Sequence, residues 1–115
     1  MVDPTIDLAT FEELQHTAGS DFVKELIDAF LEEAPRMIDE LSSAITARDA
    51  ERFRRAAHSL KSNSLTFGAR ALGAMARDLE LQGLSAKPEA DTKRLEALSG
   101  LYARVAVALK GLRDD

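Results

Sequence analysis

Apolar residues recur at intervals of three and four along most of the chain, a spacing that places side chains on one face of an α-helix. The longest stripe runs from residue 22 to residue 45 and predicts one long helix. Pro35 lies inside it, so we expect a bend near Leu31 to Pro35, after which the helix continues because the stripe resumes in register. The stripe consists of Phe22, Leu26, Ile27, Phe30, Leu31, Met37, Ile38, Leu41 and Ile45.

A short helix is predicted before this long one. Thr10 and the following Phe-Glu-Glu-Leu have the form of a capping box, which predicts a helix to about Thr17 that ends at Gly19. Residues 1–9 show no periodicity and contain Pro4, so we expect them to be an extended lead-in. Ser20 or Asp21 is expected to cap the long helix.

Three further helices follow from the same signals. Asp49 is expected to cap the central helix, and Gly68 closes it near Phe67. The next helix begins after Ala69 and ends at Gly83, and the last begins at Asp91 after a loop over residues 84–89. Their inward residues are predicted to be Phe53, Ala57, Leu60, Ser64 and Phe67, then Leu72, Met75, Ala76 and Leu79, then Leu95, Leu98, Leu101, Tyr102, Val105 and Leu109.

Five amphipathic helices joined by short loops predict an all-α fold. Short connections make consecutive helices antiparallel neighbours, so we expect an up-and-down antiparallel four-helix bundle with the short extra N-terminal helix lying across one end. With 115 residues, 45% of them hydrophobic, the whole of 1–115 is expected to be a single domain.

Composition narrows the function. A net charge of -5, from 20 acidic and 15 basic residues, argues against a nucleic-acid partner. The sequence has no cysteine, no targeting leader and no apolar run of bilayer length, which indicates a soluble, cytoplasmic protein without membrane insertion. The acidic residues of the long helix have no histidine or cysteine at ligand spacing, so no metal site is expected.

One histidine stands on the polar side of the central helix. At about 100° per residue, His58 falls outside the apolar stripe and beside Arg54, Lys61, Ser62 and Leu65. His58 is therefore expected to face solvent. Other arginines gather near it, and for Arg52 and Arg55 the plainer interpretation is a solvated helix surface, whereas Arg54 is the better functional candidate.

These neighbours suit an imidazole that receives a phosphoryl group. Neutral imidazole is a competent nucleophile near neutral pH, and the cation of Lys61, with that of Arg54, would offset the phosphoryl charge. Ser62 leaves room above the ring. The plainer alternative is an ordinary surface histidine.

The stretch AHSLKSNSLTFGARALGAMARDLE, residues 57–80, resembles the signature of histidine-containing phosphotransfer (HPt) domains. The family pattern is a histidine, any residue, leucine, lysine and then glycine or serine, with a glycine ten residues after the histidine. These positions are His58, Leu60, Lys61, Ser62 and Gly68 here. Glycine is the commoner residue where this chain has Ser62, which is a mild departure that bears on how closely a partner approaches.

The resemblance implies a phosphorelay intermediate that carries a phosphoryl group on His58 between aspartates of receiver domains. It implies that Glu80 holds the second ring nitrogen, although a plain surface glutamate is the alternative. It also implies a phosphoryl carrier without autokinase activity, with no cofactor of its own and with Mg²⁺ on the partner receiver domain. We expect a monomer.

Two other functions stay open from the sequence. One is a helical adaptor that binds a partner through the same face without being phosphorylated, and the other is the substrate domain of a chemotaxis-type histidine kinase. A free-standing protein and a domain of a hybrid sensor kinase both fit the sequence. Leu65 lies outward two turns after His58 with no intramolecular contact evident, so Ser62 and Leu65 are expected to form a docking surface.

Overall fold

The computed structural model describes residues 5–114, and these residues form five α-helices and no strand. The all-α prediction is confirmed. The helices are α1 (Leu8–Ala18), α2 (Ser20–Ala47), α3 (Ala50–Thr66), α4 (Arg70–Gln82) and α5 (Pro88–Asp114). None of these five helices is long and apolar enough to cross a membrane.

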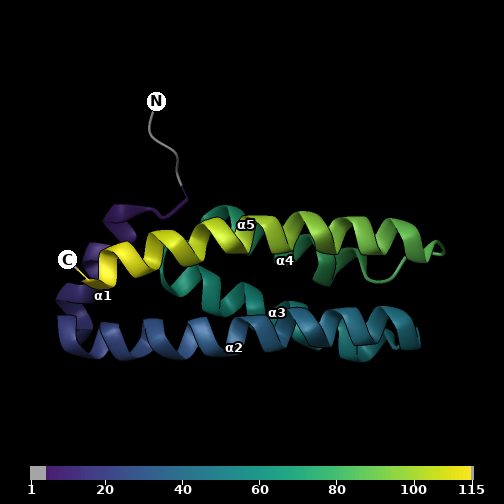
Figure 1. The fold of residues 1–115 in the computed structure, drawn as a ribbon, viewed down its shortest axis with the longest axis horizontal. Coiled ribbons are helices and arrows are strands. Elements are labelled where there is room, and N and C mark those ends of the chain that lie inside the picture. Colours follow the sequence, from purple (N-terminus) through teal and green to yellow (C-terminus); the bar gives the residue numbers. More distant parts are fainter. Residues whose placement is uncertain (1–4, 115) are drawn as a thin grey trace.

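The four longer helices form an antiparallel bundle. Helix α2 packs against α3 and α5, and α4 packs against the same two helices, so α3 and α5 lie on a diagonal. The short helix α1 contacts α2 and α3 at the end of the bundle where α5 finishes (Figure 1). The predicted arrangement, with the extra helix across one end, is confirmed.

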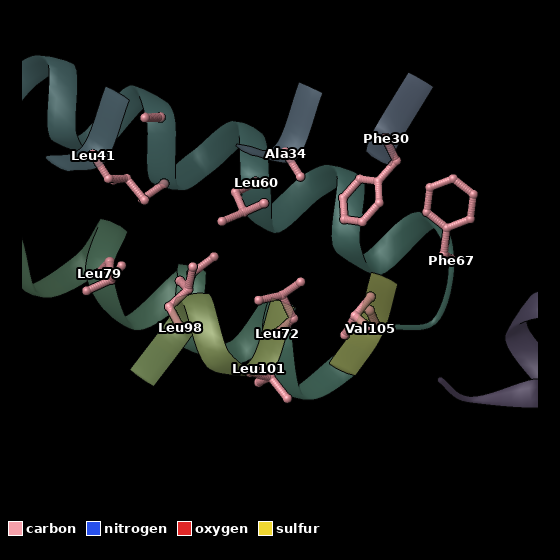
Figure 2. Close-up of a cluster of buried hydrophobic side chains, with 14 of the residues drawn as sticks. Phe30, Ala34, Leu41, Leu60, Phe67, Leu72, Leu79, Leu98, Leu101 and Val105 are labelled. Carbon is pink, nitrogen blue, oxygen red and sulfur yellow. The ribbon is translucent and has the colours of Figure 1, made fainter. Parts of the chain in front are cut away.

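Side chains from all four bundle helices meet in one core. Figure 2 shows Phe30, Ala34 and Leu41 of α2 with Leu60 of α3, Leu72 of α4 and Leu98 of α5. The predicted inward residues of α3 are all buried. The prediction that Phe22 faces inward was wrong. Phe22 is 51% exposed near the start of α2, and Val23 is buried in its place.

Helix α2 continues through Pro35 without a break, as predicted. The proline has no N–H to donate to the carbonyl of Leu31. The hydroxyl of Tyr102 on α5 lies 3.5 Å from that carbonyl oxygen and supplies a weak substitute donor. The bend expected at this position stays a prediction.

Several helix starts differ from the prediction. Helix α1 begins at Leu8, so Thr10 lies within the helix, where its hydroxyl donates to Asp7 at 2.8 Å instead of capping the backbone. Gly19 precedes α2, so neither Ser20 nor Asp21 is its cap. For α3 the prediction is confirmed, since the carboxylate of Asp49 accepts from the amide of Arg52 at 3.1 Å.

The structure differs from the extended lead-in that was predicted for residues 1–9. Residues 1–4 lie outside the described residues, and residues 8 and 9 already belong to α1. Between them Ile6 is buried, and the amide of Asp7 donates to the carbonyl of Gly68 at 2.8 Å. This segment is therefore part of the packed structure at the end of α3.

The last helix begins three residues before the predicted start. Pro88 is its first residue, a position that tolerates the missing amide of proline. Asp91 therefore lies in the first turn, where its side chain is fully buried. Its carboxylate accepts from Arg48 at 3.0 Å, from Arg94 at 2.5 Å and from the amide of Ser85 at 3.0 Å.

Candidate functional site

Helix α3 presents His58 to solvent because its opposite face is apolar and faces the core. Phe53, Ala57, Leu60 and Ser64 are buried along that face, and the hydroxyl of Ser64 donates to the carbonyl of Leu60 at 2.6 Å. The imidazole of His58 is 54% exposed, as its helical position predicts. A partner therefore has access to the ring without any movement of the bundle.

The carboxylate of Glu80, on α4, holds two side chains of α3. Its Oε2 lies 2.7 Å from Nδ1 of His58, and its Oε1 accepts from Nζ of Lys61 at 2.8 Å. The Glu80 side chain is only 14% exposed. The structure therefore brings together three of the residues that the sequence singled out.

The charge state of Glu80 fixes the direction of the hydrogen bond to His58. The hydrogen bond from Lys61, and next that from His58, lower the pKa of Glu80 despite the opposing effect of burial. Glu80 is therefore a carboxylate near neutral pH and can only accept. In a neutral ring Nδ1 must then carry the proton, which leaves the lone pair on Nε2.

Arg54 is engaged elsewhere. Its guanidinium donates to both carboxylate oxygens of Glu51, at 2.7 and 3.3 Å, and this pairing raises the pKa of Arg54. Arg54 is exposed on the helix that carries His58, as predicted, but its hydrogen bonds run to Glu51 and not to the imidazole.

Leu65 and Ser62 lie on the same outward side of α3. Ser62 is exposed, and Leu65 is 46% exposed. Leu65 has an intramolecular contact that was not evident from the sequence, because a methyl group built at Gly73 of α4 would lie 2.6 Å from a Leu65 methyl carbon. Leu65 therefore covers Gly73, and part of its apolar surface is already used inside the molecule.

Gly68 is required by the backbone at the end of α3. Its φ is +81°, a region that side chains disfavour, and a methyl group there would lie 2.8 Å from the carbonyl oxygen of Asp7. The turn after α3 and the segment before α1 approach closely only because this position has no side chain.

The side of α3 that faces α2 carries cations that sequence reasoning treated as solvated. Arg52 and Arg55 line an open groove with Arg36 and Glu40 of α2 and with Ser59. This side of α3 could have been identified from the sequence. At helical spacing, Arg52, Arg55 and Ser59 fall on the flank of His58 opposite Lys61. Within residues 5–114 no group of three or more histidine, cysteine or acidic side chains could hold a metal ion.

Comparisons with known proteins agree with this geometry. The family model described as "Hpt domain" matches residues 25–108. The chain is 31% identical over 84 residues to the sensor protein TorS of Escherichia coli K12, a match that covers 73% of this chain and 9% of TorS. The crystal structure of histidine-containing phosphotransfer protein B (HptB) from Pseudomonas aeruginosa PAO1 is similar, with a TM-score of 0.86, 26% identity, and coverage of 98% of this chain and 97% of that one.

Proposed function

Because the chain belongs to the Hpt domain family and is a histidine phosphotransfer intermediate of phosphorelays, we propose that His58 carries the phosphoryl group and that Nε2 is the accepting atom. The observation that carries this proposal is the hydrogen bond of 2.7 Å between Nδ1 and Glu80. It occupies one ring nitrogen and leaves the other, on an exposed side chain, for chemistry.

The reaction follows from this arrangement. The lone pair of Nε2 attacks the phosphorus of an aspartyl phosphate on a receiver domain, the bond from phosphorus to the aspartate oxygen breaks, and aspartate leaves as a carboxylate. Glu80 keeps the proton of Nδ1 in a hydrogen bond and stabilises the positive charge that the ring gains. The reverse attack by an aspartate of a second receiver returns the ring to its first state.

Lys61 acts on this reaction through Glu80. Its ammonium lies 2.8 Å from the carboxylate that orients the ring, so it fixes the position of Glu80. Ser62 and the exposed part of Leu65 would lie under the approaching receiver as the docking surface.

The rest of the reaction depends on the partner. The receiver supplies Mg²⁺ and an acidic pocket. The chain itself acts as a carrier without autokinase activity. It does so as a monomer in the cytoplasm. The sequence has no glycine-rich loop for the phosphates of ATP, which supports the absence of autokinase activity. The match spans 9% of TorS, so the role of any larger protein that contains such a domain is separate from this proposal.

Incubation with a radiolabelled, phosphorylated receiver domain tests the proposal. The chain should acquire an acid-labile, base-stable label, and His58→Gln should acquire none while its circular dichroism stays unchanged, since the side chain is exposed. His16→Gln, at an exposed position of α1, is the matched control and should be labelled like the parent. Label on His58→Gln would refute the assignment, and an unlabelled parent chain would favour an adaptor.

A further inference from the structure

The orientation of the imidazole shows where a phosphoryl group on Nε2 would lie. Nδ1 points toward Glu80 on α4. The two nitrogens of an imidazole project in nearly opposite directions within the ring plane, so Nε2 points away from α4. On the side of α3 that borders α2, Arg55 and Ser59 lie on the flank of His58 opposite Lys61, away from Glu80.

That side of α3 is locally basic although the chain carries a net charge of -5. The groove between α2 and α3 is lined by three guanidinium groups, those of Arg36, Arg52 and Arg55, and by one carboxylate, that of Glu40. Arg52 is neutralised by Glu40 at 2.6 Å, and Arg36 contacts Glu32 at 3.3 Å. Arg55 is the third guanidinium.

Arg55 is the least committed of these cations. It lies one turn before His58, its side chain is 66% exposed, and its contact with Glu51 is 3.9 Å, too long for a hydrogen bond. Glu51 is already bonded to Arg54 at 2.7 Å. On the α4 side of His58, Lys61 is bonded to Glu80 at 2.8 Å.

We propose that Arg55 binds the phosphoryl group carried on Nε2 of His58, with Ser59 and the α2/α3 groove beside it. This inference rests on the proposed function of His58. A guanidinium presents a planar fork of donors that matches two phosphoryl oxygens, and Arg55 can adopt that geometry without breaking an existing hydrogen bond. Arg54, which the sequence favoured, would first have to leave Glu51.

The test uses phosphoramidate as the phosphodonor, so that no receiver contributes charge. Nε2 attacks its phosphorus, the P–N bond breaks and ammonia leaves. The full chain, Arg55→Gln, Arg54→Gln and Arg104→Gln are phosphorylated, and ³¹P NMR follows the rate and the titration of the phosphoryl group. Arg104 is an exposed arginine of α5, the helix diagonal to α3, and serves as the matched control.

Arg55→Gln should slow phosphorylation about threefold to tenfold and raise the pKa of the phosphoryl group, because the neighbouring cation that favours its dianion is removed. A structural role would not move that pKa. Arg104→Gln should match the parent. A phosphoryl pKa that shifts in Arg54→Gln but not in Arg55→Gln would overturn the inference while leaving His58 as the acceptor, whereas an unlabelled His58 in the parent chain would overturn both.

Discussion

At the scale of single residues, one carboxylate organises the site. Glu80 accepts from His58 and from Lys61 at the same time, so the ring tautomer and the position of the lysine depend on one another. The exposure of His58 could be predicted from spacing, because an apolar stripe defines which side of a helix faces water. The bond to Glu80 could not be worked out from spacing, since it depends on how two helices are placed relative to each other. It was expected only from the family resemblance.

Removal of the Glu80 carboxylate should release the imidazole. Glu80→Ala is expected to slow phosphoryl transfer from a phosphorylated receiver about tenfold, because the ring loses its fixed orientation. Glu80→Gln should keep most of the rate, since an amide oxygen can still accept from Nδ1. Stopped-flow transfer measurements check this, with Asp78→Ala on exposed α4 surface as the control. Equal rates for Glu80→Ala and the parent would show that Glu80 does not orient the ring.

At the scale of helices, two glycines let neighbouring segments of the chain approach each other closely, and these contacts set the geometry around the site. Gly73 lets Leu65 of α3 pack over α4, and this contact lies two turns along from the pair formed by His58 and Glu80. Gly68 lets the turn after α3 meet the backbone of Asp7. Both glycines thus fix how α3 sits against its neighbours.

Gly68→Ala should lower the free energy of unfolding by about 1 to 3 kcal/mol, because the new methyl group would require a disfavoured φ and would collide with the carbonyl of Asp7. Urea denaturation measures this change. Gly100→Ala provides the matched control, since Gly100 lies inside α5 with open space around it and should gain up to about 1 kcal/mol. A stability loss in Gly100→Ala that equals the loss in Gly68→Ala would contradict this explanation.

Helix faces could be predicted more reliably than helix starts. The inward stripe of α3 was correct because many residues contribute to a periodic pattern. The starts of α1 and α5 were wrong because each depended on one residue, and tertiary contacts decided its role. Thr10, inside α1, donates to Asp7 just before the helix, and Asp91 accepts from Arg48, which is 43 positions away in sequence. Local sequence does not contain that information.

At the scale of the whole molecule, a buried ionic cluster fastens the end of the bundle opposite α1 (Figure 1). Asp91 of α5 joins Arg48 in the turn between α2 and α3 to Ser85 in the connection after α4. Arg94 also donates to the carbonyl of Gly83 at 2.8 Å. The cluster therefore fixes the C-terminal end of α4, the helix that positions Glu80.

The cluster predicts a loss of stability in acid. Burial raises the pKa of Asp91, but hydrogen bonds from Ser85, Arg94 and Arg48 outweigh it and lower the pKa from 3.8 to about 2. A lowered folded-state pKa contributes stability above about pH 4 that is lost as pH falls toward 2, here about 2 kcal/mol. Urea unfolding of the parent and of Asp91→Asn between pH 7 and pH 2 measures this contribution.

The stability difference between the parent and Asp91→Asn should therefore shrink as pH falls through this range. Asp28→Asn is the control, because Asp28 also pairs with an arginine, Arg113 at 2.6 Å, but on the exposed surface. Its substitution should change stability little at any pH. A difference between the parent and Asp91→Asn that stays constant from pH 7 to pH 2 would contradict the role given to the Asp91 carboxylate.

The most direct measurement of the central claim is the position of the phosphorus atom. Long-range ¹H–¹⁵N and ³¹P NMR spectra of the uniformly ¹⁵N-labelled, phosphorylated chain show which imidazole nitrogen is bonded to phosphorus and which retains a proton. The account predicts phosphorus on Nε2 of His58, with the proton on Nδ1 held by Glu80. Phosphorus on Nδ1 of His58, or on either nitrogen of His16, would contradict it.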